Sequence, residues 1–235
     1  MKLKDNYQDL WEKLPITISD EQFGKLEKLM DSVIQMNQKL NLTRIIDNDD
    51  FAMRHIFDSL AVNMPEGDSV LDVGTGGGFP GLPLAVCYPE KQFILLDATA
   101  KKIKAVKQIA KAVDIPNVNF LIGRAEDLSR DERYRESFDI VTSRAVAAYA
   151  ILSELCLPFV KLGGHFLAWK GPGSEKEVKD GGKATILLGG NLPEIKDKNV
   201  LKNRGVHVII FCEKIHETPK KYPRAFGQIK KKPLK

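Results

Sequence analysis

The sequence predicts an α/β fold in which a mostly parallel sheet follows a helical extension. Three observations lead to this prediction. Helical periodicity marks residues 20–40 and 49–63, strand-like and helical segments alternate from Ser69 onward, and the first strand runs straight into a glycine cluster. Apolar strands that alternate with helices form a parallel sheet with helices on both faces.

Two helices are expected before the first strand. Apolar side chains recur at helical spacing in residues 20–40, where Ser19 or Asp20 can cap the helix start. Residues 49–63 repeat the pattern, with a few polar side chains among the apolar ones. These segments form an N-terminal helical extension that we assign to residues 1–65.

Six strands and four helices are expected after the extension. The expected strands are Val70–Val73, Gln92–Asp97, Val118–Gly123, Phe138–Thr142, His165–Lys170 and Val206–Glu213. The expected helices are Leu82–Cys87, Lys101–Val113, Ala147–Leu157 and Ser174–Leu187. The last two strands resemble a hairpin across a polar loop, which would place one of them antiparallel at the sheet edge. We assign this core to residues 66–213.

The end of the chain is strongly basic. Residues 213–235 hold eight Lys or Arg against two Glu, a net charge of +6, although the whole chain carries only +5. A cationic segment of this kind indicates a polyanionic partner, with a solvated basic surface as the alternative. We assign residues 214–235 to a basic C-terminal tail packed on or flanking the core.

Composition excludes several classes of protein. Hydrophobic residues make up 43% and charged residues 29%, as in soluble globular domains, and no apolar run approaches the ~20 residues of a membrane-spanning helix. The N-terminus lacks the apolar core of a signal peptide, so a cytoplasmic protein is expected. Cys87, Cys156 and Cys212 lie far apart, which favours reduced core thiols and argues against a metal site.

The segment Val70–Gly81 places a glycine cluster between a buried strand and a helix, which is the arrangement of a nucleotide-cofactor site. Glycine permits positive φ and a close approach of the backbone to a ligand. Counted from Gly74, the dinucleotide fingerprint fails because Phe79 replaces its third glycine. Counted from Gly76 the fingerprint fits, but it starts two residues late and includes Pro80. This weakens the prediction of an NAD site without excluding it.

Polar residues follow four successive strands. Asp97 ends the second and can accept hydrogen bonds from ribose hydroxyls, with helix capping as the alternative. Ala125 and Glu126 follow the third and can flank an adenine, and Arg144 follows the fourth. Asp72 suits either ligand contact or a buried bond to the backbone. These groups predict one crevice, whose glycine turn with ribose and adenine contacts fits S-adenosylmethionine (SAM).

This pattern resembles class I SAM-dependent methyltransferases. Further segments resemble one family of these enzymes, the bacterial small-subunit ribosomal RNA guanine-N7 methyltransferases (RsmG, also called GidB or glucose-inhibited division protein B). They run in family order over nearly the whole chain, and their combination is specific. The segments are Asn41–Thr43, Arg54–Leu60, Asp72–Gly81, Leu96–Lys102, Arg124–Glu126, Thr142–Ala147, Lys170–Gly171 and Lys220–Arg224. Lys102 stands where the family often has Arg.

The resemblance implies a class I SAM-dependent methyltransferase fold, which is Rossmann-like with a mostly parallel seven-stranded sheet, and SAM as the methyl donor. The implied acceptor is N7 of a guanine in the 530 loop (position 527) of 16S rRNA, on naked rRNA or on the small ribosomal subunit. The expected cofactor-binding residues are Gly74, Gly76, Phe79, Asp97, Ala98, Thr99, Ala125, Glu126 and Arg144. We expect a monomer, with neither a membrane nor a metal as partner.

Methyl transfer to guanine N7 needs few catalytic groups from the protein. N7 carries an in-plane lone pair and no proton, so in-line methyl transfer needs neither a general base nor a metal ion. Positioning of the reacting atoms can supply ~7–11 kcal/mol of the barrier. Arg144 is the catalytic candidate, because it can bind the SAM carboxylate or donate to guanine O6. A buried structural ion pair is the alternative role for Arg144.

Six residues are candidates for binding RNA. They are Arg54, Lys170, Lys220, Lys221, Tyr222 and Arg224. Lys170 ends the fifth strand, where it can meet phosphate or stay solvated. Tyr222 lies among cations and suits base stacking, unless it packs on the domain. His55 and Asp58 can share a helix face, where a surface hydrogen bond is favoured over catalysis by His55.

Two alternative functions stay open. A small-molecule SAM methyltransferase fits the cofactor pattern equally but leaves the basic tail without a role, and deletion of residues 214–235 would then spare activity. A non-catalytic RNA-binding protein with a nucleotide-binding fold would use the tail. The intact ligand-type residues at several strand ends argue against this second alternative.

Overall fold

The structure is a computed structural model of the 235-residue chain and describes residues 2–144, 147–171, 173–196 and 208–234. Its strands are β1 (Ser69–Val73), β2 (Gln92–Asp97), β3 (Val118–Ile122), β4 (Phe138–Arg144), β5 (Val160–Lys170), β6 (Glu194–Lys196) and β7 (Val208–Glu213). Its helices are α1 (Leu3–Asn6), α2 (Gln8–Trp11), α3 (Asp20–Asn37), α4 (Asn48–Phe51), the π-helix η1 (Ala52–Phe57), α5 (Asp58–Leu60), α6 (Gly81–Cys87), α7 (Ala100–Val113), α8 (Ala125–Leu128), α9 (Tyr149–Cys156), the 3₁₀-helix η2 (Leu157–Phe159), α10 (Glu175–Leu187) and α11 (Phe226–Lys231).

In the described residues, seven strands form one sheet in the order β3-β2-β1-β4-β5-β7-β6. Strands β1 to β5 pair in parallel, whereas β7 runs antiparallel to both β5 and β6. The predicted mostly parallel sheet is confirmed, and so is the antiparallel pairing of the last two predicted strands. The outermost strand, however, is β6, which the sequence did not predict. The strand order reverses between β1 and β4, and ligands of open α/β sheets bind beside such a point.

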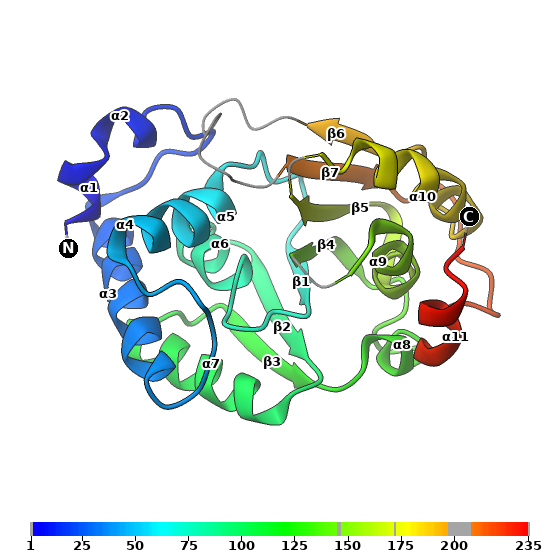
Figure 1. Cartoon of the computed structure of the whole chain (residues 1–235), viewed down its shortest axis with the longest axis horizontal. Helices are drawn as coiled ribbons and strands as arrows, with labels where there is room; N and C mark the ends of the chain where they lie inside the picture. Colours follow the sequence, from blue (N-terminus) through cyan, green and yellow to red (C-terminus); the bar gives the residue numbers. More distant parts are fainter. Residues whose placement is uncertain (1, 145–146, 172, 197–207, 235) are drawn as a thin grey trace.

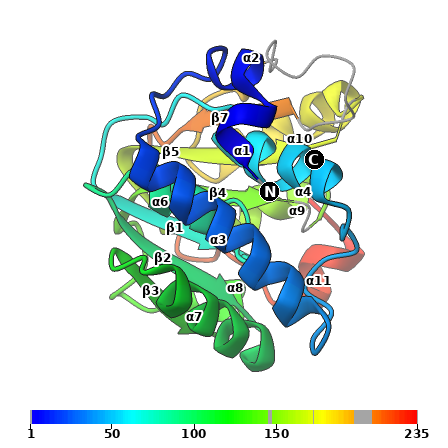
Figure 2. The ribbon, with the colours of Figure 1, turned by 90° about the vertical axis from the view of Figure 1, so that its left-hand side faces the viewer.

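Helices cover both faces of the sheet (Figures 1 and 2). Helices α3, α6 and α7 lie on one face together with α4 and α5, while α8 to α11 lie on the other. The buried side chains form two clusters accordingly, one that includes Phe57 and Phe93, the other Phe166 and Ile229. The extension and the tail both share these clusters with the sheet, so their separation into domains at residues 65 and 213 stays a prediction.

Local signals explain the helices of the extension. Ser19 caps α3, because its hydroxyl accepts from the Gln22 N–H while the Gln22 side chain accepts from the Ser19 N–H. The helix predicted over residues 49–63 consists of α4, η1 and α5 in succession. Its middle is therefore π-helical, and such turns are rare and occur frequently at functional sites.

Other boundaries differ from prediction for simple reasons. Strand β5 begins at Val160, earlier than the predicted start at His165. The first part of the strand was missed because residues 161–163 are exposed and lack the apolar pattern that predicts a strand. Helices α1, α2, α8 and α11 and strand β6 were not predicted, since elements of three to six residues are too short to show periodicity. The first two positions of the strand predicted over Val206–Glu213, and Ala145–Val146 of the matched segments, lie outside the described residues.

The cysteines lie buried as free thiols, as predicted. Burial raises the pKa of Cys87 and of Cys212 to about 12, so both stay protonated at neutral pH. No helix in the described part of the chain is long and apolar enough to cross a membrane. The same residues contain no group of three metal-ligand side chains that could hold an ion.

Asp139 ties the start of β4 to the start of β1. Its carboxylate accepts hydrogen bonds from the Ser69 N–H (2.9 Å) and hydroxyl (2.6 Å) and from the Asp68 N–H (3.1 Å), and it forms an ion pair with Lys161. Burial alone would raise the pKa of Asp139, but the bonds from Lys161 and Ser69 outweigh it and hold the pKa below its usual value.

We expect Asp139→Asn to lower the free energy of unfolding by about 1.5–3 kcal/mol at neutral pH, the range for hydrogen bonds to a charged group. Because the folded-state pKa is lowered, this stability is present above about pH 4 and is lost as pH falls through the folded pKa. Urea unfolding of both proteins at neutral and acid pH measures the difference. Asp131→Asn, which removes an exposed ion pair with Arg133, is the control and should change stability less. An equal loss for the two variants would contradict the assignment.

Candidate active site

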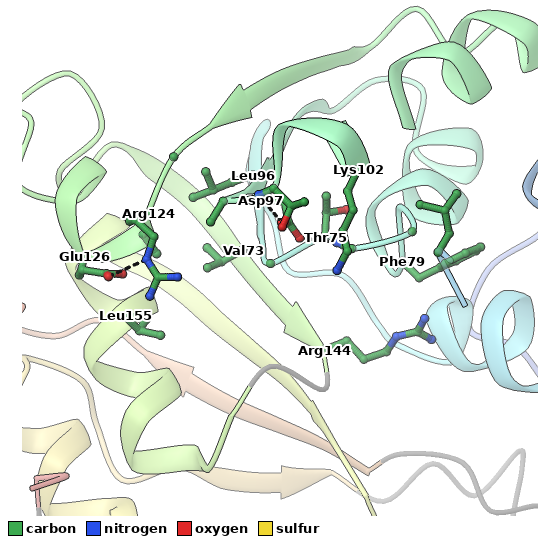
Figure 3. A pocket seen from close by; sticks show the side chains of 18 of the residues that line it. Val73, Thr75, Phe79, Leu96, Asp97, Lys102, Arg124, Glu126, Arg144 and Leu155 are labelled. Atoms are coloured by element: carbon green, nitrogen blue, oxygen red, sulfur yellow. Dashed lines mark hydrogen bonds and ion pairs between the residues drawn. The ribbon is translucent and has the colours of Figure 1, made fainter. Parts of the chain in front are cut away.

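A pocket of about 490 Å³ opens at the carboxyl ends of β1 to β4, where the strand order reverses. Val73 ends β1, Asp97 ends β2, Gly123 follows β3 and Arg144 ends β4, and all four line the pocket. The crevice predicted from four strand ends therefore exists. In Figure 3 Arg124 lies at one end of the pocket and Arg144 at the other, with Asp97 between them.

The nine predicted cofactor-binding residues all line this pocket. They are Gly74, Gly76, Phe79, Asp97, Ala98, Thr99, Ala125, Glu126 and Arg144. The structure thus brings together residues that are up to 70 positions apart in the chain, as the parallel topology requires. Their contacts with a ligand stay a prediction.

Further walls of the pocket, among them those formed by the extension, α7 and α11, were not predicted. Leu42 and His55 come from the extension, Lys102 from α7 and Phe226 from α11 in the tail. Leu42, His55 and Lys102 lie inside segments that match the family, so the resemblance could have identified them. Phe226 follows the last matched segment, and no sequence signal points to it.

The glycine turn after β1 adopts backbone angles that other residues rarely reach. Gly74 and Gly76 have φ of 72° and 58°, and the Gly74 N–H donates to the Leu96 carbonyl at 2.8 Å. This bond holds the turn against the end of β2. At Gly78 (φ 95°), a Cβ atom would approach Leu82 Cδ1 to 2.6 Å, so a side chain there would require the buried Leu82 side chain of α6 to move. The glycines therefore shape the pocket floor and hold α6 close to it.

Asp97 is buried at the centre of the pocket. One carboxylate oxygen accepts from the Gly76 N–H at 3.1 Å and the other from the Thr99 N–H at 2.8 Å. The second bond lies in the turn before α7, whose N-cap residue is Thr99, so the alternative role of Asp97 as a helix cap is not realised. Each oxygen keeps a lone pair that can accept from a ribose hydroxyl. Asp97 therefore shapes the turn and can still bind a ligand.

Asp72 does not line the pocket. Its buried carboxylate accepts from Thr142 Oγ1 at 2.9 Å and from the Gly81 N–H at 3.2 Å. Burial raises the pKa of Asp72, and these hydrogen bonds work against the rise. Of its two expected roles, the structure supports the internal one, in which Asp72 joins β1 to β4 and to the start of α6.

Arg124, Glu126 and Phe226 form one end of the pocket. Arg124 Nε donates to Glu126 Oε1 at 2.8 Å, and its guanidinium lies 4.4 Å from the centre of the Phe226 ring. Glu126 is almost fully buried, whereas Arg124 is half exposed. An apolar ring, a planar cation and an acceptor at one site suit a flat heterocycle with exocyclic donors.

Arg144 forms the other end. Its Nη1 donates to Asp58 Oδ2 at 3.1 Å and to the Arg54 carbonyl at 2.9 Å, and its Nη2 donates to His55 Nδ1 at 2.9 Å. Its guanidinium lies 5.4 Å from the Phe79 ring centre. Asp58 is fully buried, so the predicted alternative of a buried ion pair is realised. These three bonds use three of the five guanidinium donors and leave two for a ligand, because Arg144 also lines the pocket.

The RNA-binding candidates divide into two groups. Arg54, Lys220 and Lys221 are exposed, and Arg54 pairs with Asp50 across one helical turn. Lys170 instead bonds to Glu177 and to the Ala147 carbonyl, both at 2.8 Å.

The other two candidates of the tail, Tyr222 and Arg224, make contacts with the core. Tyr222 is buried, and Arg224 donates from two nitrogens to the fully buried Glu154 at 2.8 and 2.6 Å. For Tyr222 the structure thus shows the packed alternative. Base stacking by Tyr222 would require its ring to leave the core, whereas Lys170 and Arg224 already spend part of their donors on Glu177 and Glu154.

Comparison with known proteins identifies the family. The family model described as rRNA small subunit methyltransferase G matches residues 22–204. The chain belongs to this family. Its relatives include the ribosomal RNA small subunit methyltransferase G of Clostridium tetani, which is 39% identical over 100% of both chains. That of Alkaliphilus metalliredigens is 38% identical over 100% of this chain and 98% of its own.

Family membership confirms the enzyme class, SAM-dependent methylation of small-subunit rRNA, and SAM as the donor. Solved structures confirm the fold alone. A SAM-dependent O-methyltransferase from Thermotoga maritima superposes with a TM-score of 0.51 at 17% identity, covering 80% of this chain and 72% of its own. The antibiotic-resistance methyltransferase Kmr gives a TM-score of 0.52 at 18% identity, covering 64% and 88%. The class I methyltransferase fold was therefore predicted correctly.

The pocket suits SAM in size and in chemistry. Its volume of about 490 Å³ lies within the range of small-molecule sites, roughly 300–1,000 Å³. The glycine turn lets the backbone approach a ligand, Asp97 offers acceptors at the centre, and aromatic rings lie at both ends. These features match a ligand with a heterocycle, a ribose and a charged amino-acid portion in a row.

Proposed function

We propose that the chain transfers the methyl group of SAM to N7 of a guanine in the 530 loop of 16S rRNA. The observation that supports this best is the convergence of nine predicted residues on one pocket in a chain of the small-subunit rRNA methyltransferase family. The proposal includes a monomeric, cytoplasmic enzyme that uses no metal. Its substrate is rRNA, naked or within the small subunit.

Each part of the pocket has a role in this proposal. Asp97 accepts hydrogen bonds from the ribose hydroxyls, and the end formed by Glu126 and Phe226 holds the adenine. Arg144 and Phe79 form the end where transfer takes place. Bound SAM supplies an electrophilic methyl group on a sulfonium, which needs no further activation.

The protein contributes position rather than proton transfer. Guanine N7 is already a nucleophile, and holding it in line with the methyl group can supply ~7–11 kcal/mol of the barrier. Arg144 has two N–H groups left for a ligand and can donate one to guanine O6, which lies beside N7. N7 faces the deep, narrow groove of duplex RNA, so the guanine must be unpaired or splayed out to reach the pocket.

Mapping of N7-methylguanine in 16S rRNA by mass spectrometry tests the proposal. The expected result is methylation of one guanine of the 530 loop in cells with the gene, and its absence in cells without it. Purified protein with labelled SAM should restore the mark on undermethylated rRNA or on small subunits. Unlabelled rRNA in both forms would refute the proposal, and label at another base would refute its site.

The structure changes the experiment that separates this function from small-molecule methylation. Deletion of residues 214–235 cannot discriminate, because it would also remove buried Lys214 and the pocket wall at Phe226. The exposed Lys220 and Lys221 offer a cleaner change, since their side chains lie outside the core.

We expect the double variant Lys220→Ala/Lys221→Ala to bind rRNA more weakly while its affinity for SAM is unchanged. Each lost phosphate contact should lower the slope of log K against log salt by about 0.7 for single-stranded RNA. Filter binding at several salt concentrations measures this slope. Lys107→Ala/Lys111→Ala removes two exposed charges from α7 as a matched control. Unchanged rRNA affinity and slope in the tail variant would favour a small-molecule substrate.

A further inference from the structure

The π-helix η1 directs a backbone carbonyl toward Arg144. In a regular α-helix the Asp58 N–H would donate to the Arg54 carbonyl, four residues earlier. Here the Asp58 N–H donates to the carbonyls of Met53 and His55. The Arg54 carbonyl accepts from Arg144 Nη1 at 2.9 Å instead. The irregular turn thus serves to anchor the guanidinium.

His55 holds the same guanidinium from the side. Its Nδ1 lies 2.9 Å from Arg144 Nη2, and its Nε2 lies 2.7 Å from Thr43 Oγ1. A guanidinium can only donate, so Nδ1 must accept, and the single proton of a neutral imidazole is then on Nε2, where it donates to Thr43. A second proton would place two donors face to face at Nδ1 and break the bond to Arg144.

His55 also joins separate walls of the pocket. Its ring stacks on Phe79 with centres 4.3 Å apart and planes 11° apart. At Nε2 its partner is Thr43, which follows the pocket-lining Leu42. At Nδ1 its partner is Arg144, which ends β4. A change at His55 is therefore transmitted directly to the transfer end of the pocket.

We propose that His55 is a positioning residue for methyl transfer, which holds Arg144 in place while neutral and releases it when protonated. This inference rests on the proposed function, in which Arg144 orients the methyl acceptor. Of the charged groups around His55, Arg144 from β4 contacts its ring directly, Asp58 from the following helix pairs with the same guanidinium, and Asp97 and Lys102 line the same pocket. Arg144 opposes a second positive charge at this site and Asp58 favours it.

Two amide variants separate the two nitrogens of His55. The Asn side chain places its oxygen near the position of Nδ1, so His55→Asn can still accept from Arg144 and cannot be protonated. The Gln side chain reaches toward Nε2, so His55→Gln keeps the contact with Thr43 and loses the one with Arg144. His216→Asn is the matched control, because His216 is exposed in the tail.

The full-length proteins should be compared in transfer of labelled methyl from SAM to small-subunit rRNA across about pH 5–8, where imidazole titrates. The wild type and His216→Asn should lose kcat/KM toward acid pH. His55→Asn should keep its rate there, and His55→Gln should be about tenfold slower throughout. The same acid loss in His55→Asn, or wild-type rates in His55→Gln, would overturn the inference.

A second readout does not depend on activity. The ¹⁵N shifts of the imidazole of His55, assigned by loss of the signal in His55→Asn, should show the proton on Nε2 at neutral pH. A proton on Nδ1 would overturn the inference even in an active enzyme. Absence of rRNA labelling by the wild type at every pH would instead refute the proposed function, so the two failures are distinguishable.

Discussion

Replacement of Arg144 by alanine should slow methyl transfer to rRNA by roughly 10²-fold or more. In the proposed function Arg144 lies at the end of the pocket where transfer takes place, and three hydrogen bonds hold its guanidinium, so its unused donors point from a fixed position. Loss of a positioned donor or a shift of about 1 Å in the reacting groups has an effect of this size. Single-turnover transfer of labelled methyl to small-subunit rRNA measures the rate of the chemical step.

The same substitution should also destabilise the fold. Asp58 is fully buried, and removing the cation from a buried ion pair costs about 3–5 kcal/mol. Arg144→Lys separates the two effects, because lysine keeps a positive charge near Asp58 but lacks the planar fork. We therefore expect the lysine variant to unfold closer to the wild-type temperature than the alanine variant and yet to transfer methyl slowly.

An exposed arginine provides the control for this pair of variants. Arg133→Ala removes an arginine whose ion pair with Asp131 lies at the surface, and it should change neither rate nor stability appreciably. A lysine variant with the wild-type transfer rate would show that Arg144 acts through charge alone. An alanine variant with the wild-type rate would show that Arg144 takes no part in methyl transfer.

The pocket floor could be predicted because its determinants are local. A strand that ends in glycines, a carboxylate at the end of the next strand, and polar residues after the third and fourth strands must meet when the strands are parallel. Gly74, Asp97 and Arg144 illustrate this, since each lies at a strand end or directly after one, and Glu126 lies four residues beyond the end of β3. Topology alone then brings them together.

The roles of charged residues outside the floor could not be predicted, because they depend on distant partners. Lys170 ends β5 as expected but pairs with Glu177 of α10. Arg224 belongs to a basic segment but pairs with Glu154 of α9, 70 residues away. Composition records the charge of a segment and not the partner of each side chain. A high net charge in the tail therefore predicted more free cations than the fold leaves.

Truncation after Glu213 should abolish cooperative folding, which makes it the largest structural effect expected in this chain. Lys214 is fully buried, donates to the Leu157 carbonyl at 2.7 Å and pairs with Glu136 at 2.9 Å, although burial lowers its pKa. Removal of Arg224 would leave the buried carboxylate of Glu154 without this partner, at a cost of about 3–5 kcal/mol. Loss of these contacts together reaches the whole stability of a typical domain, about 5–15 kcal/mol.

Thermal unfolding followed by circular dichroism measures this effect, and calorimetry with SAM measures its consequence for the pocket. Lys230→Ala/Lys231→Ala is the matched control, because it removes two exposed charges of the tail and leaves the buried anchors in place. Phe226→Ala tests the pocket wall formed by α11. This variant should fold as the wild type does and should bind SAM more weakly, because Phe226 lines the pocket. A truncated protein that unfolds cooperatively at the wild-type temperature would show that the tail is dispensable. If the charge control were the unstable variant, the stabilising role would belong to the surface charges and not to the buried contacts.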